Sequence, residues 1–378
     1  MRILAVCNYQ PPHMGGIEYA VEALKKCWLQ DGHDVTWLTT DIPQRPELHQ
    51  PGNIRIQAAN FFEKAWQINS PIPYPWVIPA IRRQIRAHDV VNIHSLAPGL
   101  STLTLALAVR MGKPVVATQH VGIIPLQYAW MSSLQQHFIC GMAEWGFRRG
   151  MKLTFVGKAV RAWFLEHTRI PENDIVMTPA GIDPQNYYFV PEPERQVLIR
   201  KWQLSEESLN VLFVGRFYEK KGLPLIRDVA KACPNMRFTL VGKGPIDASQ
   251  WNLPNVRILP FVETAELREL YGAHDLFIMP SFGEGWPAVV PQAMACGLTC
   301  LVSPETFEGY GQDAERFIVC PRDAGSLTRE LQSWQTRRPE LLHRREDQSR
   351  YALAQWNWMN TARIYAAMFK KLLVTTVS

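Results

Sequence analysis

A pair of cations that follows a short apolar run is one sign of chemistry in this 378-residue sequence. Val211–Val214 is apolar throughout, and Gly215, Arg216 and then Lys221 come after it. A guanidinium donates a fork of hydrogen bonds and an ammonium acts as a point charge, so together they suit a diphosphate. They could stabilise it as a leaving group without a metal. For this stretch alone, a solvated charged turn is the alternative.

A second stretch, residues 280–297, places a carboxylate between two glycines. The apolar run Leu276–Met279 leads into Gly283–Glu284–Gly285, and a helix is expected soon afterwards. Pro287 and Pro291 are tolerated only near a helix start, so free backbone amides are expected just before that helix. Packing does not readily explain Glu284 in this setting. A ligand that hydrogen-bonds both a carboxylate and backbone amides explains it better.

A third loop follows the first apolar run and carries the glycine pair Gly15–Gly16. Glycines between a strand and a helix let the backbone approach a ligand, and the helix start offers amide donors to an anion. The spacing is not that of the G-x-G-x-x-G dinucleotide fingerprint. A tight structural turn and a ligand loop are equally good interpretations of this loop alone.

The elements that must position these loops alternate between short apolar runs and helix-length amphipathic stretches, which predicts parallel α/β layers. The expected strands are 3–7, 35–39, 54–58, 90–94, 115–118, 153–156 and 175–178, then 211–214, 238–241, 256–259, 276–279, 299–302 and 317–319. The expected helices are 18–30, 79–87, 100–111, 127–149, 158–167, 223–232, 265–271, 290–295 and 324–334. The proline-rich segment Pro184–Glu194 is interpreted as a linker. Two α/β domains of similar size, with a cleft between them, are expected.

Composition excludes several classes of protein. Hydrophobic residues make up 47% and charged residues 20%, which predicts a folded, cored chain. The net charge of +6 is far below that of a nucleic-acid binder. Seven cysteines without a C-x-x-C pair argue against a disulfide framework and favour a reducing compartment. Neither a signal peptide nor a spanning segment is evident, so a cytoplasmic location is expected, with contact to the inner face of the membrane left open.

These motifs together resemble the retaining glycosyltransferases of family 4 (glycosyl transferases group 1). The resemblance spans almost the whole chain, through Gly15–Glu18, Thr118–His120, Ala180–Asp183, Gly215–Gly222 and Gly283–Gly297. It implies the GT-B fold, in which two Rossmann-like α/β/α domains face each other across a cleft. The expected domains are an acceptor-side domain over 1–185 and a nucleotide-sugar domain over 186–356. A C-terminal helix over 357–378 is expected to return to the first domain.

The resemblance also implies roles for individual residues. Arg216 and Lys221 would hold the donor diphosphate, Glu284 would meet the donor sugar, and His120 would lie beside the transferred sugar, so these four are the candidate catalytic residues. The implied donor-binding residues are Gly15, Gly16, Gly215, Gly283, Gly285, Trp286, Pro287 and Gln292. Gly16 would face the diphosphate from the other domain.

Gln292 departs from the family pattern, which has a second glutamate at this position. That carboxylate typically accepts hydrogen bonds from the nucleotide ribose in relatives. Glutamine keeps one acceptor but loses the charge and the bidentate option. Since a charge-assisted hydrogen bond contributes about 1.5–3 kcal/mol and a neutral one about 0.5–1.5, donor binding is expected to weaken roughly tenfold. A chain that binds donor without turnover is therefore a second interpretation.

No metal or other cofactor is expected. The sequence has no Asp-x-Asp pair, and His94 and His120 each stand alone, without a partner at metal-ligand spacing. His94 ends an expected strand; it either lines the acceptor side or is a hydrogen-bonded histidine at the edge of the core.

Aromatic residues beside basic clusters occur twice in the first half. The first group is Phe61–Trp66 and Tyr74–Ile78 with Arg82, Arg83 and Arg86; the second is Tyr128, Trp130, Phe138, Trp145 and Phe147 with Arg148, Arg149 and Lys152. Such combinations suit a lipid interface with anionic headgroups. A core edge with a solvated rim is the equal alternative.

The sequence thus predicts a metal-independent transferase that moves a sugar from a nucleotide-diphosphate donor to a hydroxyl, with retention of configuration. The acceptor is expected to be a glycan or a lipid-linked molecule, as in surface polysaccharide, lipopolysaccharide or glycolipid assembly. The alternatives are a non-catalytic partner protein that binds nucleotide sugars, and another GT-B enzyme such as a sugar-nucleotide epimerase or a phosphorylase.

Overall fold

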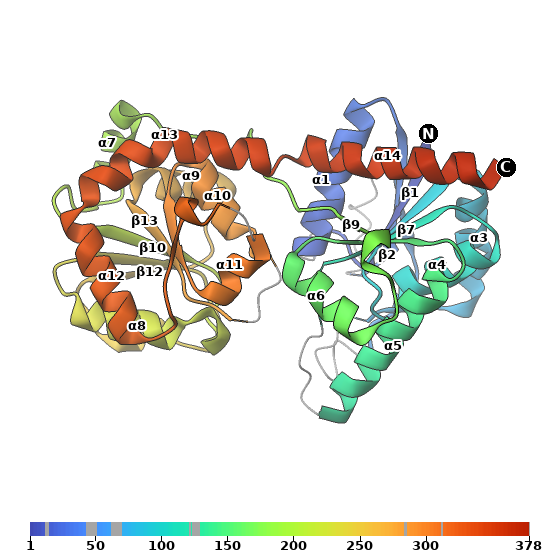
Figure 1. Ribbon diagram of the computed structural model, residues 1–378, viewed down its shortest axis with the longest axis horizontal. Coiled ribbons are helices and arrows are strands. Elements are labelled where there is room, and N and C mark those ends of the chain that lie inside the picture. Colours follow the sequence, from blue (N-terminus) through green and yellow to red (C-terminus); the bar gives the residue numbers. More distant parts are fainter. Residues whose placement is uncertain are drawn as a thin grey trace. The chain divides into compact units, whose positions relative to one another are not determined.

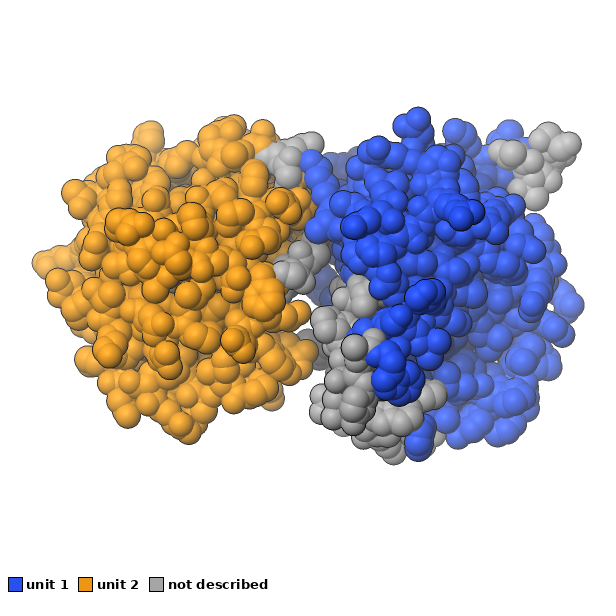
Figure 2. All heavy atoms as spheres, turned by 60° about the horizontal axis from the view of Figure 1, so that its bottom comes forward, with its two compact units in different colours: residues 1–181, 358–378 blue, residues 182–357 orange. Residues whose placement is uncertain are grey.

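The computed structural model describes residues 1–11, 15–42, 51–61, 70–120, 122, 129–282, 286–310 and 313–377. The chain forms two compact units, which Figure 2 distinguishes by colour. Unit 1 comprises residues 1–181 and 358–378, and unit 2 comprises residues 182–357. Each unit has its own hydrophobic core around a parallel sheet.

Unit 1 is built on a seven-stranded parallel sheet with the strand order β3-β2-β1-β6-β7-β8-β9. Alternate residues of β1 enter cores on opposite faces of this sheet, Leu4 and Val6 on one and Ile3 and Ala5 on the other. This double burial explains why β1 is apolar from Ile3 to Val6. The strands are β1 (Arg2–Val6), β2 (Asp34–Thr40), β3 (Asn53–Ile56), β6 (Val90–His94), β7 (Val115–Gln119), β8 (Lys152–Phe155) and β9 (Ile175–Met177), besides the small antiparallel pair β4 (Ala58–Ala59) and β5 (Ile72–Pro73).

The helices of unit 1 include one from the far end of the chain, α14 (Trp358–Val377), which lies against α1 (Gly16–Gln30) (Figure 1). The indole Nε1 of Trp28 donates to the Ala362 carbonyl over 3.1 Å. The Tyr365 hydroxyl lies 2.7 Å from Thr118 Oγ1 and donates to Thr178 Oγ1 over 3.1 Å, so α14 is tied to the ends of the sheet strands. The other helices that the described residues form are α3 (Ile78–Ala87), α4 (Leu100–Arg110), α5 (Ala129–Phe147) and α6 (Lys158–His167), with short 3-10 turns at Pro75–Val77 and Glu172–Asp174.

Unit 2 is built on a six-stranded parallel sheet with the order β12-β11-β10-β13-β14-β15. Its strands are β10 (Asn210–Val214), β11 (Arg237–Val241), β12 (Val256–Leu259), β13 (Leu276–Met279), β14 (Thr299–Val302) and β15 (Phe317–Val319). Its helices are α7 (Glu192–Lys201), α8 (Leu223–Ala232), α9 (Thr264–Ala273), α10 (Val289–Ala295), α11 (Pro304–Tyr310), α12 (Ala324–Thr336) and α13 (Arg338–Gln355). Short 3-10 turns lie at Glu219–Lys221, Ala248–Trp251 and Ala314–Arg316.

The predicted linker is wrong at its C-terminal end. The prediction places Pro184–Glu194 in an irregular segment, but α7 begins at Glu192 and has Pro193 in its first turn. Proline is tolerated there because the first helical amides have no intrahelical acceptor and the fixed φ of proline suits a helix. Proline-rich composition alone therefore did not mark the end of the irregular segment.

Both sheets reverse their direction of winding beside the first strand of the unit. In unit 1 the chain runs from β1 outward to β3 and then resumes at β6, on the other side of β1. In unit 2 it runs from β10 outward to β12 and resumes at β13, on the other side of β10. In open parallel sheets, ligands bind at such a switch point, beyond the ends of the strands. The loops after β1, β6, β10 and β13 therefore frame the candidate sites.

Candidate active-site loops

The loops that follow β10 and β13 contact each other at the switch point of unit 2. Gly222 has the left-handed φ of +80°, and a Cβ atom there would lie 2.5 Å from the Pro280 carbonyl oxygen. The Phe282 amide donates to the Lys220 carbonyl over 2.9 Å. Only a glycine permits this approach of two backbones. The segment that holds Arg216 and Lys221 is thereby fixed against the start of the loop that leads to Glu284.

Arg216 is exposed, and its guanidinium is oriented by a neighbouring tyrosine. Its Nη2 donates to the Tyr218 hydroxyl over 2.8 Å, and its Cζ lies 4.8 Å from the centre of the Tyr218 ring. Within the described part of the chain Arg216 makes no ion pair. Its charge is therefore available to an anionic ligand. Lys221 is partly exposed and ends the 3-10 turn Glu219–Lys221 that leads into α8.

The loop after β13 is anchored at its beginning. Arg322 donates from Nε to the Pro280 carbonyl over 3.1 Å, and its Cζ lies 4.5 Å from the Phe282 ring centre. Ser303 Oγ donates to the Ser281 carbonyl over 2.5 Å, which ties the loop to the end of β14. The predicted residues Gly283, Glu284 and Gly285 lie outside the described residues.

The predicted residues that come next in the chain are held by aromatic side chains. The Pro287 carbonyl accepts a hydrogen bond of 2.6 Å from the Tyr310 hydroxyl. The Trp286 ring centre lies 5.7 Å from that of Tyr310 and 6.4 Å from that of Trp356. Gln292 is partly buried within α10. Of the residues predicted in unit 2, Gly215, Arg216 and Lys221 thus lie in the segment that contacts the start of the β13 loop. The predicted residues that follow this loop and lead into α10 are Trp286, Pro287 and Gln292.

In unit 1 the predicted glycine pair begins α1. Gly15 is the extended N-cap residue of this helix, and apart from the adjoining backbone no described residue has an atom within 4 Å of the place where a Cβ of Gly16 would be. A Cβ at Gly15, by contrast, would meet the Glu18 carboxylate. The buried Glu18 carboxylate therefore lies beside Gly15 at the helix start, a favourable position for a negative charge. The sequence reasoning gave Glu18 no role of its own.

The prediction that His94 and His120 stand alone is wrong. Asn92 and His94 lie on β6, and His120 directly follows β7, the neighbouring strand. His94 Nδ1 lies 2.9 Å from His120 Nε2, and His94 Nε2 lies 2.6 Å from Asn92 Oδ1. The signal for this contact was present, because parallel strands that are neighbours bring their C-terminal residues to the same edge.

Burial lowers the pKa of His120 to about 4. It also holds the pKa of His94 well below its ordinary value, with a smaller contribution from His120. Both imidazoles are therefore neutral at pH 7 and act through hydrogen bonds rather than charge. Among the described residues, no group of three histidine, cysteine, aspartate or glutamate side chains is placed to hold a metal ion.

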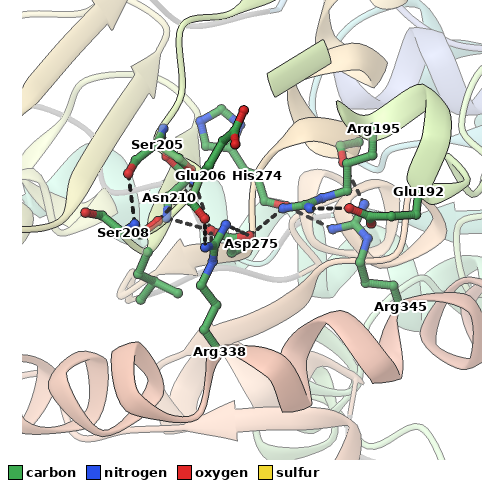
Figure 3. Close-up of polar contacts among 12 residues, drawn as sticks. Glu192, Arg195, Ser205, Glu206, Ser208, Asn210, His274, Asp275, Arg338 and Arg345 are labelled. Carbon is green, nitrogen blue, oxygen red and sulfur yellow. Dashed lines mark hydrogen bonds and ion pairs between the residues drawn. The ribbon is translucent and has the colours of Figure 1, made fainter. Parts of the chain in front are cut away.

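A second polar cluster lies at the opposite edge of the unit 2 sheet, where β10 and β13 begin (Figure 3). Asp275 is fully buried and accepts from Arg195 over 2.5 Å, from Arg338 over 3.0 Å and from the Asn210 amide over 2.8 Å. Arg345 donates to the carbonyl oxygens of Gly272 and His274 over 2.7 and 2.9 Å. These contacts join α7, the sheet and α13, so this cluster is structural and was not predicted.

Two family models match the chain. The model described as Glycosyltransferase Family 4 matches residues 14–186, and the model described as Glycosyl transferases group 1 matches residues 208–336. The first match lies almost wholly in unit 1 and the second wholly in unit 2.

Individual relatives are distant. One component of the phosphatidylinositol N-acetylglucosaminyltransferase of Arabidopsis thaliana is 22% identical over 79% of this chain, which spans 66% of that relative's length. A GDP-mannose-dependent alpha-mannosyltransferase of Mycobacterium tuberculosis is 23% identical over 94% of this chain and 90% of its own.

Solved structures show the fold over the full length. Sucrose-phosphate synthase from Thermosynechococcus elongatus has a TM-score of 0.76 at 18% identity and covers 99% of both chains. Anabaena Alr3699/HepE, solved in complex with UDP, has a TM-score of 0.76 at 14% identity and covers 98% of this chain and 100% of its own. The complex of HepE with UDP-glucose has a TM-score of 0.72. With its two parallel-sheet units and its two family matches, the chain belongs to the family 4 (group 1) glycosyltransferases and has the GT-B fold.

Proposed function

We propose that this protein transfers a sugar from a nucleoside-diphosphate sugar to a hydroxyl group of a glycan or lipid-linked acceptor, with retention of configuration. The observation that carries the proposal is the switch point of unit 2. There the exposed guanidinium of Arg216 and the ammonium of Lys221 belong to a segment fixed against the β13 loop by Gly222 and by the hydrogen bond from Phe282 to Lys220. A fork donor and a point charge at the ends of parallel strands match a diphosphate.

The relatives support the same class of donor. The mycobacterial relative is named for its dependence on GDP-mannose, and HepE has been solved with UDP and with UDP-glucose. These names differ in base and sugar, so they support a nucleotide-sugar donor and leave its identity to experiment.

In the proposed reaction the bond between the sugar and the diphosphate breaks, and the acceptor hydroxyl attacks the same carbon from the same face. Arg216 and Lys221 stabilise the negative charge that develops on the departing diphosphate. Fixed cations at the developing charge lower the barrier because they need no reorganisation during the reaction. His120 lies beside the transferred sugar in this proposal, and Glu284 contacts it.

The first test is kinetic. Arg216→Ala and Lys221→Ala are expected to lower turnover by about two to three orders of magnitude, as does the loss of one donor that stabilises transition-state charge. Arg227→Ala is the matched control, because Arg227 is half-exposed on α8 in the same unit and pairs only with its neighbour Asp228 among the described residues. Near-normal turnover in both site variants, with melting temperatures equal to that of the control, would refute the diphosphate assignment.

An exposed apolar face on α5 supports the lipid-linked form of the acceptor. Trp130, Leu134 and Phe138 follow at intervals of four residues and are 66%, 64% and 38% exposed. Residues four apart lie on one face of a helix. The exposed Arg148 and Arg149 follow the helix directly. The apolar face lies in the first half of α5 and the two cations lie beyond its other end, where Arg148 also pairs with Glu144. An exposed apolar face suits insertion into a lipid surface, and cations on the same helix add attraction to anionic headgroups. Among the helices of the described residues, none combines the length and the hydrophobicity that a bilayer span requires.

The second test measures co-sedimentation with anionic liposomes at low salt. The wild type is expected to sediment with them, and the double variant Trp130→Ser, Leu134→Ser is expected to lose at least tenfold in binding, because each exposed side chain would bury apolar area in the lipid. Leu29→Ser, at a 48% exposed leucine of α1, is the control and is expected to bind as the wild type does. Equal binding of all three proteins would remove the support for a lipid-linked acceptor.

A donor-binding protein without turnover is the second candidate, and the observation that favours it is Gln292 in place of the family's glutamate. It predicts that a nucleotide diphosphate binds in an Arg216-dependent way while no sugar is transferred to any acceptor. The third possibility is an epimerase or a phosphorylase. Product analysis in the absence of an acceptor separates it from the transferase and from the donor-binding protein.

A further inference from the structure

Three side chains of unit 1 form a continuous chain of hydrogen bonds toward a candidate catalytic residue. Asn92 donates from Nδ2 to the Val116 carbonyl over 3.3 Å, and its Oδ1 lies 2.6 Å from His94 Nε2. His94 Nδ1 in turn lies 2.9 Å from His120 Nε2. Asn92 and His94 are fully buried, whereas His120 is partly exposed. The chain of contacts therefore leads from the interior of the sheet to its accessible edge.

The hydrogen bond that Asn92 donates decides which atom is the donor in each of the following hydrogen bonds. Because the Asn92 amide group donates to a carbonyl, its Oδ1 is the acceptor that faces His94, and His94 Nε2 must carry the proton. A neutral imidazole with a proton on Nε2 has a bare Nδ1, which can only accept. His120 Nε2 must therefore carry a proton and donate it to His94 Nδ1.

The alternative of a charged pair is disfavoured. Burial holds the pKa of both imidazoles below the ordinary value, and two rings in hydrogen-bond contact oppose each other's protonation. His120 Nδ1 makes no hydrogen bond to any described residue, and it is not among the described polar atoms that are both buried and unpaired. This bare nitrogen is thus left for a ligand.

We infer that Asn92 and His94 are positioning residues that hold His120 as the neutral Nε2–H tautomer, so that its Nδ1 accepts a hydrogen bond from a hydroxyl group of the bound sugar. The inference rests on the proposed function, and it adds which kind of group on the sugar His120 recognises. A ligand hydroxyl group can donate a hydrogen bond to the bare Nδ1 of His120. A carbonyl or phosphate oxygen has no proton to donate, so its lone pair would repel the lone pair of Nδ1. The hydrogen bond made by one ring nitrogen of a histidine generally decides which tautomer the other nitrogen presents.

Variants of His94 test the positioning role. His94→Leu removes the acceptor for His120, and kcat/KM is expected to fall roughly tenfold, the equivalent of one neutral hydrogen bond. His94→Asn is expected to restore most of the loss, because the amide Oδ1 can replace Nδ1 as the acceptor. His88→Leu is the matched control: His88 is also buried in unit 1, with its ring nitrogens on the Gln84 carbonyl and Thr36, at the other edge of the sheet.

The decisive measurement is the tautomer of His120 by nitrogen NMR of the ring, on the full-length protein at pH 7, with assignment by His120→Gln. The wild type is expected to show Nε2 protonated and Nδ1 bare, and His94→Leu to lose this preference while His88→Leu keeps it. A protonated Nδ1 or an imidazolium in the wild type would overturn the inference. So would a His94→Leu variant with unchanged tautomer and rate. The NMR result needs no turnover, so a failure of the proposed transferase activity is recognised separately, by absent product.

Discussion

At the scale of single residues, Gln292 is where this chain departs from its family. It lies partly buried in α10, directly after the loop that is expected to hold the donor. Its amide oxygen can accept one hydrogen bond but carries no charge. If the position contacts the nucleotide ribose, the present residue weakens the donor complex without removing the diphosphate contacts of Arg216 and Lys221.

Gln292→Glu is therefore expected to tighten the binding of the preferred nucleoside diphosphate by about tenfold, because a charge-assisted hydrogen bond replaces a neutral one. Titration calorimetry measures this directly. Gln332→Glu, on the exposed face of α12, adds the same charge to unit 2 away from the site and is expected to leave the affinity unchanged. Weaker binding in Gln292→Glu than in the wild type would show that glutamine serves another purpose there.

Residue types and their spacing predicted part of the candidate site. Another part depends on which strands are neighbours in the sheet, which residue types do not reveal. Arg216 and Lys221 could be named as candidates because a guanidinium and an ammonium that follow an apolar run suit an anionic ligand. The contact of His94 with His120 could not be read from either residue alone, since it depends on β6 and β7 being neighbours in the sheet. Glu18 was overlooked because a carboxylate in the first turn of a helix is a common capping feature.

At the scale of elements, runs of apolar residues predicted the buried strands well. Helices whose buried face contains polar side chains were predicted poorly. Val90–His94 and Leu276–Met279 have the predicted bounds because both faces of each sheet are covered. Helix α13 was missed because its buried face includes Arg345, Gln348 and Ser349, so its hydrophobic periodicity is weak. The side chains of Arg345 and Ser349 satisfy carbonyl oxygens at the ends of other elements, as in the hydrogen bond of Ser349 to Ala295.

The cluster around Asp275 holds these elements together, and Asp275→Ala is expected to destabilise unit 2 by about 3–5 kcal/mol, because it removes the buried carboxylate that pairs with both Arg195 and Arg338 and leaves the buried Arg195 with only the half-exposed Glu192 as an ionic partner. Urea unfolding followed by circular dichroism measures the loss. Asp228→Ala removes a half-exposed pair with Arg227 on α8 and is expected to cost less than about 1 kcal/mol. Equal losses in the two variants would mean that the buried cluster contributes no more than a surface pair.

At the scale of the whole molecule, the same winding pattern occurs in both units. Each sheet reverses direction beside its first strand, and the candidate residues follow the strands at or next to that reversal: the start of α1 and His120 in unit 1, Arg216 and Lys221 in unit 2. The sequence predicted this two-part α/β organisation from the restart of the strand–helix alternation. The return of α14 to unit 1 was expected only from the family resemblance, because nothing in the composition of residues 358–377 identifies the core that they join.

The most direct measurement is a thermal-shift panel of UDP, GDP, ADP and CMP on the wild type, Arg216→Ala and the control Arg227→Ala. A ligand at a hundred times its dissociation constant stabilises the folded state by about 2.7 kcal/mol, which corresponds to a shift of roughly 5–10 °C for a unit of this size. One diphosphate is expected to raise the melting temperature of the wild type and of Arg227→Ala, and to leave Arg216→Ala unchanged. No shift with any diphosphate, or an equal shift in Arg216→Ala, would contradict the assignment of this loop as the donor site.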